Sequence, residues 1–285
     1  MRYSITLIAL LIFVSSSISI SSAQDSTIHL STQLKTDPDN FDVRLFRSIN
    51  NSRTKFKDAV IPVIDKTMMP VSIILPFGLF IYGRASDNAY EENTGFLHGM
   101  SVLTNTALTF SLKFLIKRPR PYVSLKNVYC KGAARHDKYS FPSGHTSYSF
   151  STATMFTLRY PKYPQVYLPL YAWSFIVGYG RVYLGMHYPS DVLGGIAVGT
   201  LSSVLIYSLR SEILKFKNNI FNENKPDANI DSKSLGVIAG TFILSSAVNE
   251  FITPLFNHNK KHKLNFSLYP VMKSNSAGIG MDVRW

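Results

Sequence analysis

Cysteine and charge are both scarce in this sequence. Cys130 is the only cysteine in 285 residues, so an intrachain disulfide and a cysteine-based zinc site are both excluded. Charged residues make up only 16% of the chain, and hydrophobic residues make up 46%. Soluble domains usually carry roughly 25% charged residues. Most of the chain therefore needs an apolar environment. We expect one main domain, and a lipid bilayer is a candidate for its apolar environment.

Acidic residues are the scarcer of the charged residues. The chain has 17 Asp and Glu against 30 Lys and Arg, which gives a formal net charge of +13. Clustered cations can indicate nucleic-acid binding. Here they are spread over predicted helix ends and loops beside long apolar stretches. We therefore expect no nucleic-acid partner, because anionic lipid headgroups or phosphorylated substrates explain the charge better.

The N-terminal residues have the three parts of a secretory signal. Arg2 precedes an apolar run over 5–14, and Ser-rich sequence then ends at Ser22-Ala23. We expect residues 1–23 to be a cleaved signal peptide, followed by a polar exported leader and a first amphipathic helix within 24–58. The alternative is an uncleaved anchor helix, which would also direct the following sequence to the membrane.

Apolar, helix-length stretches recur through the rest of the chain. They lie at 67–83, 95–112, 139–158, 163–180, 192–209 and 234–249. Each is close to the roughly 20 residues that cross a hydrocarbon core. The sequence therefore predicts an all-α helical bundle with six core helices that span a membrane or pack at one, and a core domain over 59–220. The alternative is a large soluble helical domain whose buried helices are apolar on all sides.

The C-terminal part differs from the core. Residues 221–233 are polar and predict a surface linker, and the apolar helix expected at 234–249 opens a segment over 234–285. Apolar and polar residues then alternate from Leu264 to Tyr269 and from Ile279 to Trp285. This period of two predicts a terminal β-hairpin.

The first of three polar clusters contains Lys113 and Arg120. Pro119 and Pro121 cannot continue a helix, so we expect a helix to close near Lys113 and Arg120 to sit in a rigid turn. An ammonium and a guanidinium held near one point suit a phosphoryl group. The alternative is an ordinary solvated basic loop.

The second cluster is Pro142-Ser143-Gly144-His145. Ser143 fits a helix N-cap, and Gly144 leaves a first-turn amide exposed, so the helix start is a ready anion site. His145 can donate a proton near neutral pH. The alternative is a capped helix with a surface histidine.

The third cluster contains Arg181, His187 and Asp191. Tyr188-Pro189 predicts a helix start and places Asp191 in the first turn, where its carboxylate can reach His187. A carboxylate bonded to one ring nitrogen leaves the other as a base or nucleophile. Arg181 can complete a cationic cradle. The alternative is a histidine packed at a helix boundary, with an aspartate that favours the helix dipole.

Together the clusters resemble the three-part signature of the type 2 phosphatidic acid phosphatase (PAP2) superfamily. That fold is shared with vanadium-dependent haloperoxidases and class A bacterial acid phosphatases. Lys113, Arg120 and Pro121 match the first motif, residues 142–145 the second, and Arg181, His187 and Asp191 the third. The third motif often begins Ser-Arg, whereas Gly180 precedes Arg181 here, so any hydroxyl contact from that position is missing. The resemblance covers roughly residues 60–210.

The resemblance implies a role for each motif residue. His187 would be the nucleophile that forms a phosphohistidine, with Asp191 as its orienting partner and His145 as the general acid. The phosphoryl oxygens would be bound by Lys113, Arg120, Arg181, the Ser143 hydroxyl and the Gly144 amide. Neither a metal ion nor another cofactor is implied.

We therefore expect a phosphatase that acts on a phosphomonoester or pyrophosphate of a lipid. If the helices alternate across a membrane, all three clusters fall on one side, and the basic loops 159–162 and 210–217 fall on the other. This places the site on the exported face, in an inner membrane with the site facing the periplasm. The alternatives are a soluble periplasmic acid phosphatase, a haloperoxidase, and a non-catalytic lipid-binding envelope protein. The sequence does not name the substrate.

Overall fold

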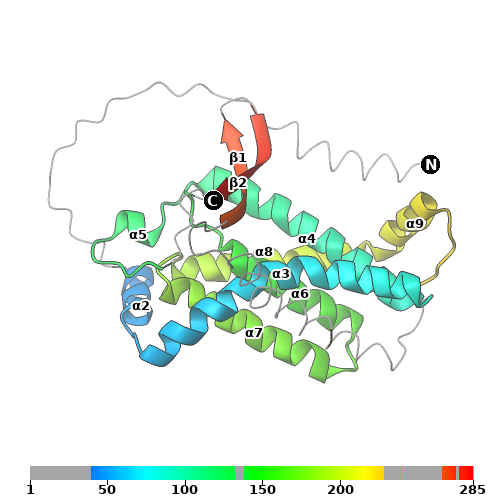
Figure 1. Ribbon diagram of the computed structural model, residues 1–285, viewed down its shortest axis with the longest axis horizontal. Helices are drawn as coiled ribbons and strands as arrows, with labels where there is room; N and C mark the ends of the chain where they lie inside the picture. Colours follow the sequence, from blue (N-terminus) through cyan, green and yellow to red (C-terminus); the bar gives the residue numbers. More distant parts are fainter. Residues whose placement is uncertain (1–39, 132–137, 228–239, 241–264, 274–275, 285) are drawn as a thin grey trace. The chain divides into compact units, whose positions relative to one another are not determined.

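Helices make up the core of the chain. A computed structural model describes residues 40–131, 138–227, 240, 265–273 and 276–284 (Figure 1). The helices are α2 (Phe41–Asn50), α3 (Lys55–Ala85), α4 (Ala89–Ile116), α5 (Pro121–Ser124), α6 (Gly144–Arg159), α7 (Pro164–Tyr183), α8 (Pro189–Ser208) and α9 (Arg210–Phe221). The predicted all-α core is therefore confirmed.

Helix α6 lies at the centre of the bundle, where it contacts α3, α4, α7 and α8 (Figure 1). Its buried face carries mostly hydroxyl side chains. Ser101 of α4 bonds to Ser151 at 2.8 Å and to Ser203 of α8 at 2.7 Å. A Cβ on Gly199 would lie 2.1 Å from the Ser147 carbonyl oxygen, so α6 and α8 touch backbone to backbone. Small residues permit such close approach, and their hydroxyl groups join the three helices.

The segment after residue 40 departs from the single amphipathic helix that the sequence predicts. Helix α2 ends at Asn50, and α3 begins at Lys55 with Thr54 as its N-cap. The Thr54 hydroxyl accepts a hydrogen bond from the Lys57 amide at 3.2 Å, which satisfies one of the free amides of the first turn. Helix α3 then continues to Ala85, so the boundary predicted between residues 58 and 59 falls inside it.

Three of the described helices, α3, α4 and α8, are long and apolar enough to cross a membrane. Large apolar side chains also project from the bundle, among them Phe77, Leu103 and Leu201, which are 64%, 64% and 62% exposed. Extensive apolar exposure is typical of a surface that contacts lipid. These features support a membrane protein.

Five of the six predicted apolar stretches overlap the described helices α3, α4, α6, α7 and α8, although α6 begins only at Gly144. Helix α6 has 16 residues and is rich in buried hydroxyls, which is why it does not resemble an apolar span. The sixth stretch, 234–249, lies outside the described residues apart from Gly240, as do the predicted signal peptide and most of the leader.

Buried ion pairs hold the end of the bundle where α3 meets α4. The Glu92 side chain is fully buried and accepts hydrogen bonds from Lys217 at 3.0 Å, Lys225 at 2.9 Å and Arg84 at 3.2 Å. Arg159 is also buried and donates to Asp227 at 2.9 Å. Several cations that the sequence assigns to basic loops are therefore neutralised in pairs. The number of Lys and Arg residues in the loops 159–162 and 210–217 therefore overstates the unpaired positive charge there.

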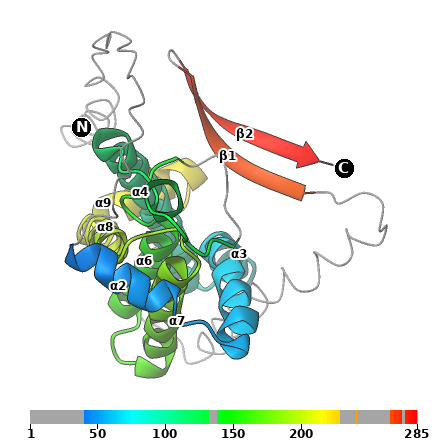
Figure 2. The same cartoon turned by 90° about the vertical axis from the view of Figure 1, so that its left-hand side faces the viewer.

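The smaller elements are helix α2 and a two-stranded hairpin. Helix α2 contacts α7 and α8 (Figure 2). In the C-terminal part, β1 (Asn265–Lys273) pairs antiparallel with β2 (Ser276–Arg284), in the region where alternation predicts a hairpin.

Replacing Glu92 with Gln should destabilise the protein strongly, because Lys217 and Lys225 would lose their shared carboxylate. Breaking a buried pair in this way costs about 3–5 kcal/mol. The matched control is Glu212→Gln, whose partner Lys215 is 70% exposed and whose loss should cost less than about 1 kcal/mol. The free energy of unfolding in detergent measures both. Equal stability of the two variants would contradict this account of the cluster.

Candidate active site

The eight motif residues lie where the ends of helices α4, α5, α6, α7 and α8 meet. Lys113 is in the last turn of α4, Arg181 is in the last turn of α7, and Asp191 is in the first turn of α8. Ser143 is the N-cap of α6, followed by Gly144 and His145, while Arg120 caps α5 and His187 lies between α7 and α8. The helix ends predicted from the prolines and the N-cap serine are therefore confirmed.

His187 is held by both of its ring nitrogens and is 2% exposed. Nδ1 lies 2.8 Å from the carbonyl oxygen of Ser140. Because a carbonyl only accepts, Nδ1 must carry the hydrogen and Nε2 the lone pair. Nε2 lies 3.2 Å from Nη1 of Arg120. Burial, together with Arg120 and Arg181, lowers the pKa of His187 well below its usual range. The ring is thus neutral, with Nε2 able to act as a nucleophile.

The sequence predicts a direct hydrogen bond between Asp191 and His187, but the structure shows a longer contact. Its Oδ2 lies 3.6 Å from His187 Nδ1 and accepts a hydrogen bond from the Tyr188 amide at 2.8 Å. The carboxylate therefore caps its own helix, α8, and the ring hydrogen goes to Ser140. A negative charge at this distance still stabilises positive charge on the imidazole.

Two residues that the sequence did not single out, Arg118 and Asp42, hold Asp191. Arg118 donates to Asp191 Oδ1 at 2.7 Å and to Asp42 Oδ2 at 2.6 Å. Asp42 also accepts from the Ser190 amide at 2.9 Å, which joins α2 to the start of α8. Arg118 lies inside the first basic cluster. Spacing alone could not show that Arg118 pairs with carboxylates of the protein while Lys113 and Arg120 lie beside His187.

The three predicted phosphate-binding cations are all buried. Lys113 donates to the Tyr139 carbonyl at 2.6 Å, and Arg120 donates to the Met186 carbonyl at 3.0 Å. Arg181 donates to Asp65 Oδ2 at 2.7 Å. All three cations act electrostatically on His187, and each lowers its pKa, so their charges converge on the imidazole. N–H donors arranged in this way suit an anion with several oxygens.

The N-terminus of α6 leaves open space next to the three cations. Ser143 is fully buried, its amide donates to the Asp191 carbonyl at 2.9 Å, and its hydroxyl lies 2.9 Å from that of Thr146. A Cβ on Gly144 would meet only the Thr109 methyl group, at 3.9 Å. The first turn of α6 therefore has room for a ligand oxygen beside its amides.

His145 is more accessible than His187, with a side chain 31% exposed. Its Nε2 lies 3.9 Å from Oδ2 of Asp65, a residue of α3 that the sequence did not indicate. Burial and Arg181 lower the pKa of His145, whereas Asp65 raises it. Among the described residues, no group of three or more His, Cys, Asp or Glu side chains gathers as a metal ion would require. The donor set of the site suits an anion.

Comparison with known proteins identifies the family. The model of the PAP2 superfamily matches residues 94–215, which include all eight motif residues. Residues 94–215 of this chain belong to the PAP2 superfamily.

Proteins similar to this chain come from several organisms. Phosphatidylglycerophosphatase B of Bacillus subtilis is 28% identical over 160 residues, which cover 53% of this chain and 71% of that protein. Lipid phosphate phosphatase 1 of Arabidopsis thaliana is 30% identical over 184 residues, which cover 53% of this chain and 55% of that protein. The crystal structure of Aquifex aeolicus LpxE superimposes with a TM-score of 0.50 at 27% identity and covers 58% of this chain and 94% of that one.

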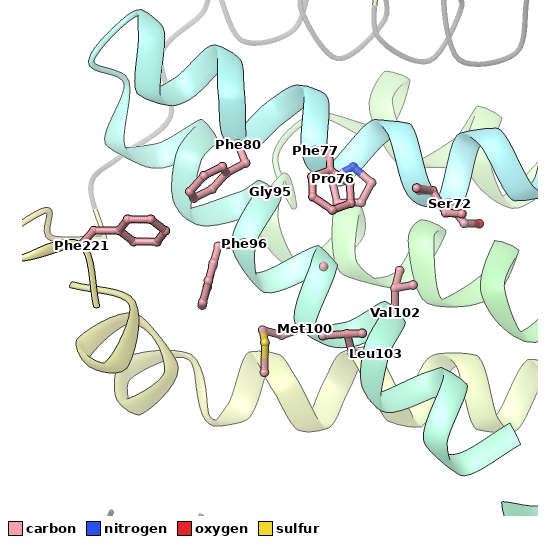
Figure 3. Close-up of a pocket in the computed structure, with 12 residues that line it drawn as sticks. Ser72, Pro76, Phe77, Phe80, Gly95, Phe96, Met100, Val102, Leu103 and Phe221 are labelled. Atoms are coloured by element: carbon pink, nitrogen blue, oxygen red, sulfur yellow. The ribbon is translucent and has the colours of Figure 1, made fainter. Parts of the chain in front are cut away.

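A separate apolar cavity lies away from the PAP2 motif residues. It has a volume of about 430 Å³ and lies between α3 and α4, with Phe77, Met100, Leu103 and Phe221 among its lining residues (Figure 3). None of the motif residues lines it. The cavity belongs to the apolar surface of the bundle rather than to the polar site.

Gly185 shapes the turn that carries His187 in this PAP2 site. Its φ is +76°, and a Cβ there would lie 2.2 Å from the Tyr129 carbonyl oxygen. Gly185→Ala should therefore lower the free energy of unfolding by more than about 1 kcal/mol. Gly99→Ala is the matched control, because no atom lies within 4 Å of its added methyl group. Thermal unfolding of both variants tests this, and a fully stable Gly185→Ala protein would contradict it.

Proposed function

We propose that this PAP2 protein is a membrane phosphatase that hydrolyses a phosphomonoester or pyrophosphate of a lipid through a phosphohistidine at His187. The observation that carries the proposal is the state of the His187 ring. Its Nδ1 hydrogen is committed to Ser140, and Nε2 stands beside Arg120 among converging cations. The similarity to enzymes named as phosphatases of lipids supports the same class of substrate.

In the first step, Nε2 of His187 attacks the phosphorus atom. The phosphorus–oxygen bond to the leaving group breaks, and its electron pair stays on the leaving oxygen, which takes a proton from His145. Lys113, Arg120 and Arg181 bind the other phosphoryl oxygens and stabilise the charge on the transferring group. The negative charge of the bound phosphate also favours the protonated form of His145, against the effect of the neighbouring cations.

In the second step, water attacks the phosphorus of phosphohistidine. His145, now neutral, accepts the proton of the attacking water. The phosphorus–nitrogen bond breaks, its electron pair returns to Nε2, and inorganic phosphate is released. The same histidine acts as acid and then as base, so the enzyme returns to its starting state.

We propose that the site faces the periplasm from an inner membrane. The signal-like sequence at 1–23 favours export, and the three apolar helices would leave the tail of a lipid substrate in the bilayer. A soluble periplasmic acid phosphatase is the alternative. The exposed apolar side chains of α4 and α8 argue against it, and carbonate extraction of native membranes separates the two. Release of the protein into the supernatant would favour the soluble enzyme.

His187→Ala should abolish phosphate release from a lipid phosphate, because no other group takes over the attack. The decrease should be at least about 10⁴-fold, as for removal of other catalytic nucleophiles. His98→Ala is the matched control, because His98 is a buried histidine of α4 that bonds to Thr152 at 3.1 Å. This control should keep the same kcat per folded molecule. Turnover at the normal rate by His187→Ala would refute its role as the nucleophile.

Activity should not depend on divalent metal ions, because the proposed chemistry uses only histidines and cationic side chains. Purified protein in detergent should release phosphate from at least one of four lipids: phosphatidic acid, phosphatidylglycerol phosphate, undecaprenyl pyrophosphate and a lipid A phosphate. Addition of EDTA should leave the rate unchanged. Loss of activity with EDTA, restored by a metal ion, would contradict the mechanism.

A further inference from the structure

Asp65 connects two groups of the site and lies outside the three motifs. It belongs to α3, and its side chain is 13% exposed. Its Oδ2 accepts a hydrogen bond from Arg181 at 2.7 Å and lies 3.9 Å from Nε2 of His145. Its other oxygen, Oδ1, is buried and makes no hydrogen bond. A buried carboxylate with an unused oxygen is costly unless it serves a nearby positive charge.

We propose that Asp65 is a positioning residue for the proton-transfer step: it fixes the Arg181 guanidinium and stabilises the positively charged form of His145. The proposal rests on the proposed function, in which His145 gives its proton to the leaving oxygen. Arg181 and Asp65 together thus link phosphate binding to acid catalysis.

The charges around His145 explain why such a residue is needed. Arg181, Arg120 and Lys113 all oppose a positive charge on this imidazole, and they reach it from α7, the α4–α5 connection and α4. Asp65 approaches from α3 and acts in the opposite direction. Without a carboxylate here, the cations that bind the substrate would also disfavour the protonated acid that the reaction requires.

The distances suit this role. At 3.9 Å, the contact between Asp65 and His145 is beyond hydrogen-bond length, so the carboxylate acts on the charge of the ring and leaves its Nε2 hydrogen free. The bond to Nη1 holds the guanidinium of Arg181, whose Nε is buried and has no hydrogen-bond partner. That Nε–H is therefore available to a phosphoryl oxygen.

The test compares two leaving groups with the full-length protein in detergent. A lipid phosphomonoester has an alkoxide leaving group that needs a proton, whereas p-nitrophenyl phosphate has one that does not. Asp65→Asn should lower kcat/KM for the lipid substrate at least about tenfold more than for the aryl substrate. This tenfold difference is part of the roughly 10²–10⁴-fold rate enhancement that a general acid supplies. Because Asp65 raises the pKa of His145, the alkaline limb of the pH profile should also move to lower pH.

Asp58→Asn is the matched control. Asp58 lies on the same helix and also pairs with an arginine, Arg53, while it accepts from the Tyr183 hydroxyl at 2.6 Å. This variant should leave both the ratio of the two substrates and the pH profile unchanged. Asp65→Glu, which keeps the charge, should retain part of the activity on the lipid substrate that Asp65→Asn loses. It also provides a second variant if Asp65→Asn folds poorly.

The outcomes separate this proposal from the proposed function. Equal losses on both substrates would mean that Asp65 acts only through phosphate binding, and they would overturn its role in proton transfer. His145→Ala should show the same preference for the aryl substrate, and Asp65→Asn should add no further preference in that background. If His145→Ala itself shows no such preference, the acid assigned in the proposed function fails instead.

Discussion

Positive charge buried at one end of the helical bundle is the constraint on which the rest of the structure depends. Lys113, Arg120 and Arg181 are each less than 10% exposed. Burial of a charge is costly unless hydrogen bonds and opposite charges compensate it. In this chain, backbone carbonyls and Asp65 supply part of that compensation. Under the proposed function, a bound phosphoryl group would add negative charge beside these cations.

The surrounding helices hold these charged side chains in fixed positions around the imidazole of His187. Asp191 caps α8, and Arg118 ties it to Asp42 of α2. The Ser143 amide fastens the start of α6 to α8 at the same point. Close contact between the backbones of α6 and α8 extends this rigid connection along the bundle, because small residues leave no space between them. A site held in this way needs little reorganisation when charge develops on the substrate.

The motif residues and the helix ends could be predicted from sequence because local chemistry determines them. Proline, the N-cap serine and the first-turn aspartate carry their signals within a few residues. The partners of those residues could not be predicted. Ser140 contributes a backbone carbonyl, which any residue has. Asp65 and Asp42 lie on helices α3 and α2, which carry none of the three motifs. Their roles arise from tertiary contacts alone.

The most direct measurement is a crystal structure of the protein with orthovanadate, an analogue of the transferring phosphoryl group. The account predicts a vanadium atom bonded to Nε2 of His187, with Lys113, Arg120 and Arg181 each donating to its oxygens at about 3 Å. His145 should face the oxygen opposite Nε2. Vanadate bound away from His187, or cations turned from its oxygens, would contradict the claim that these residues form one phosphoryl-transfer site.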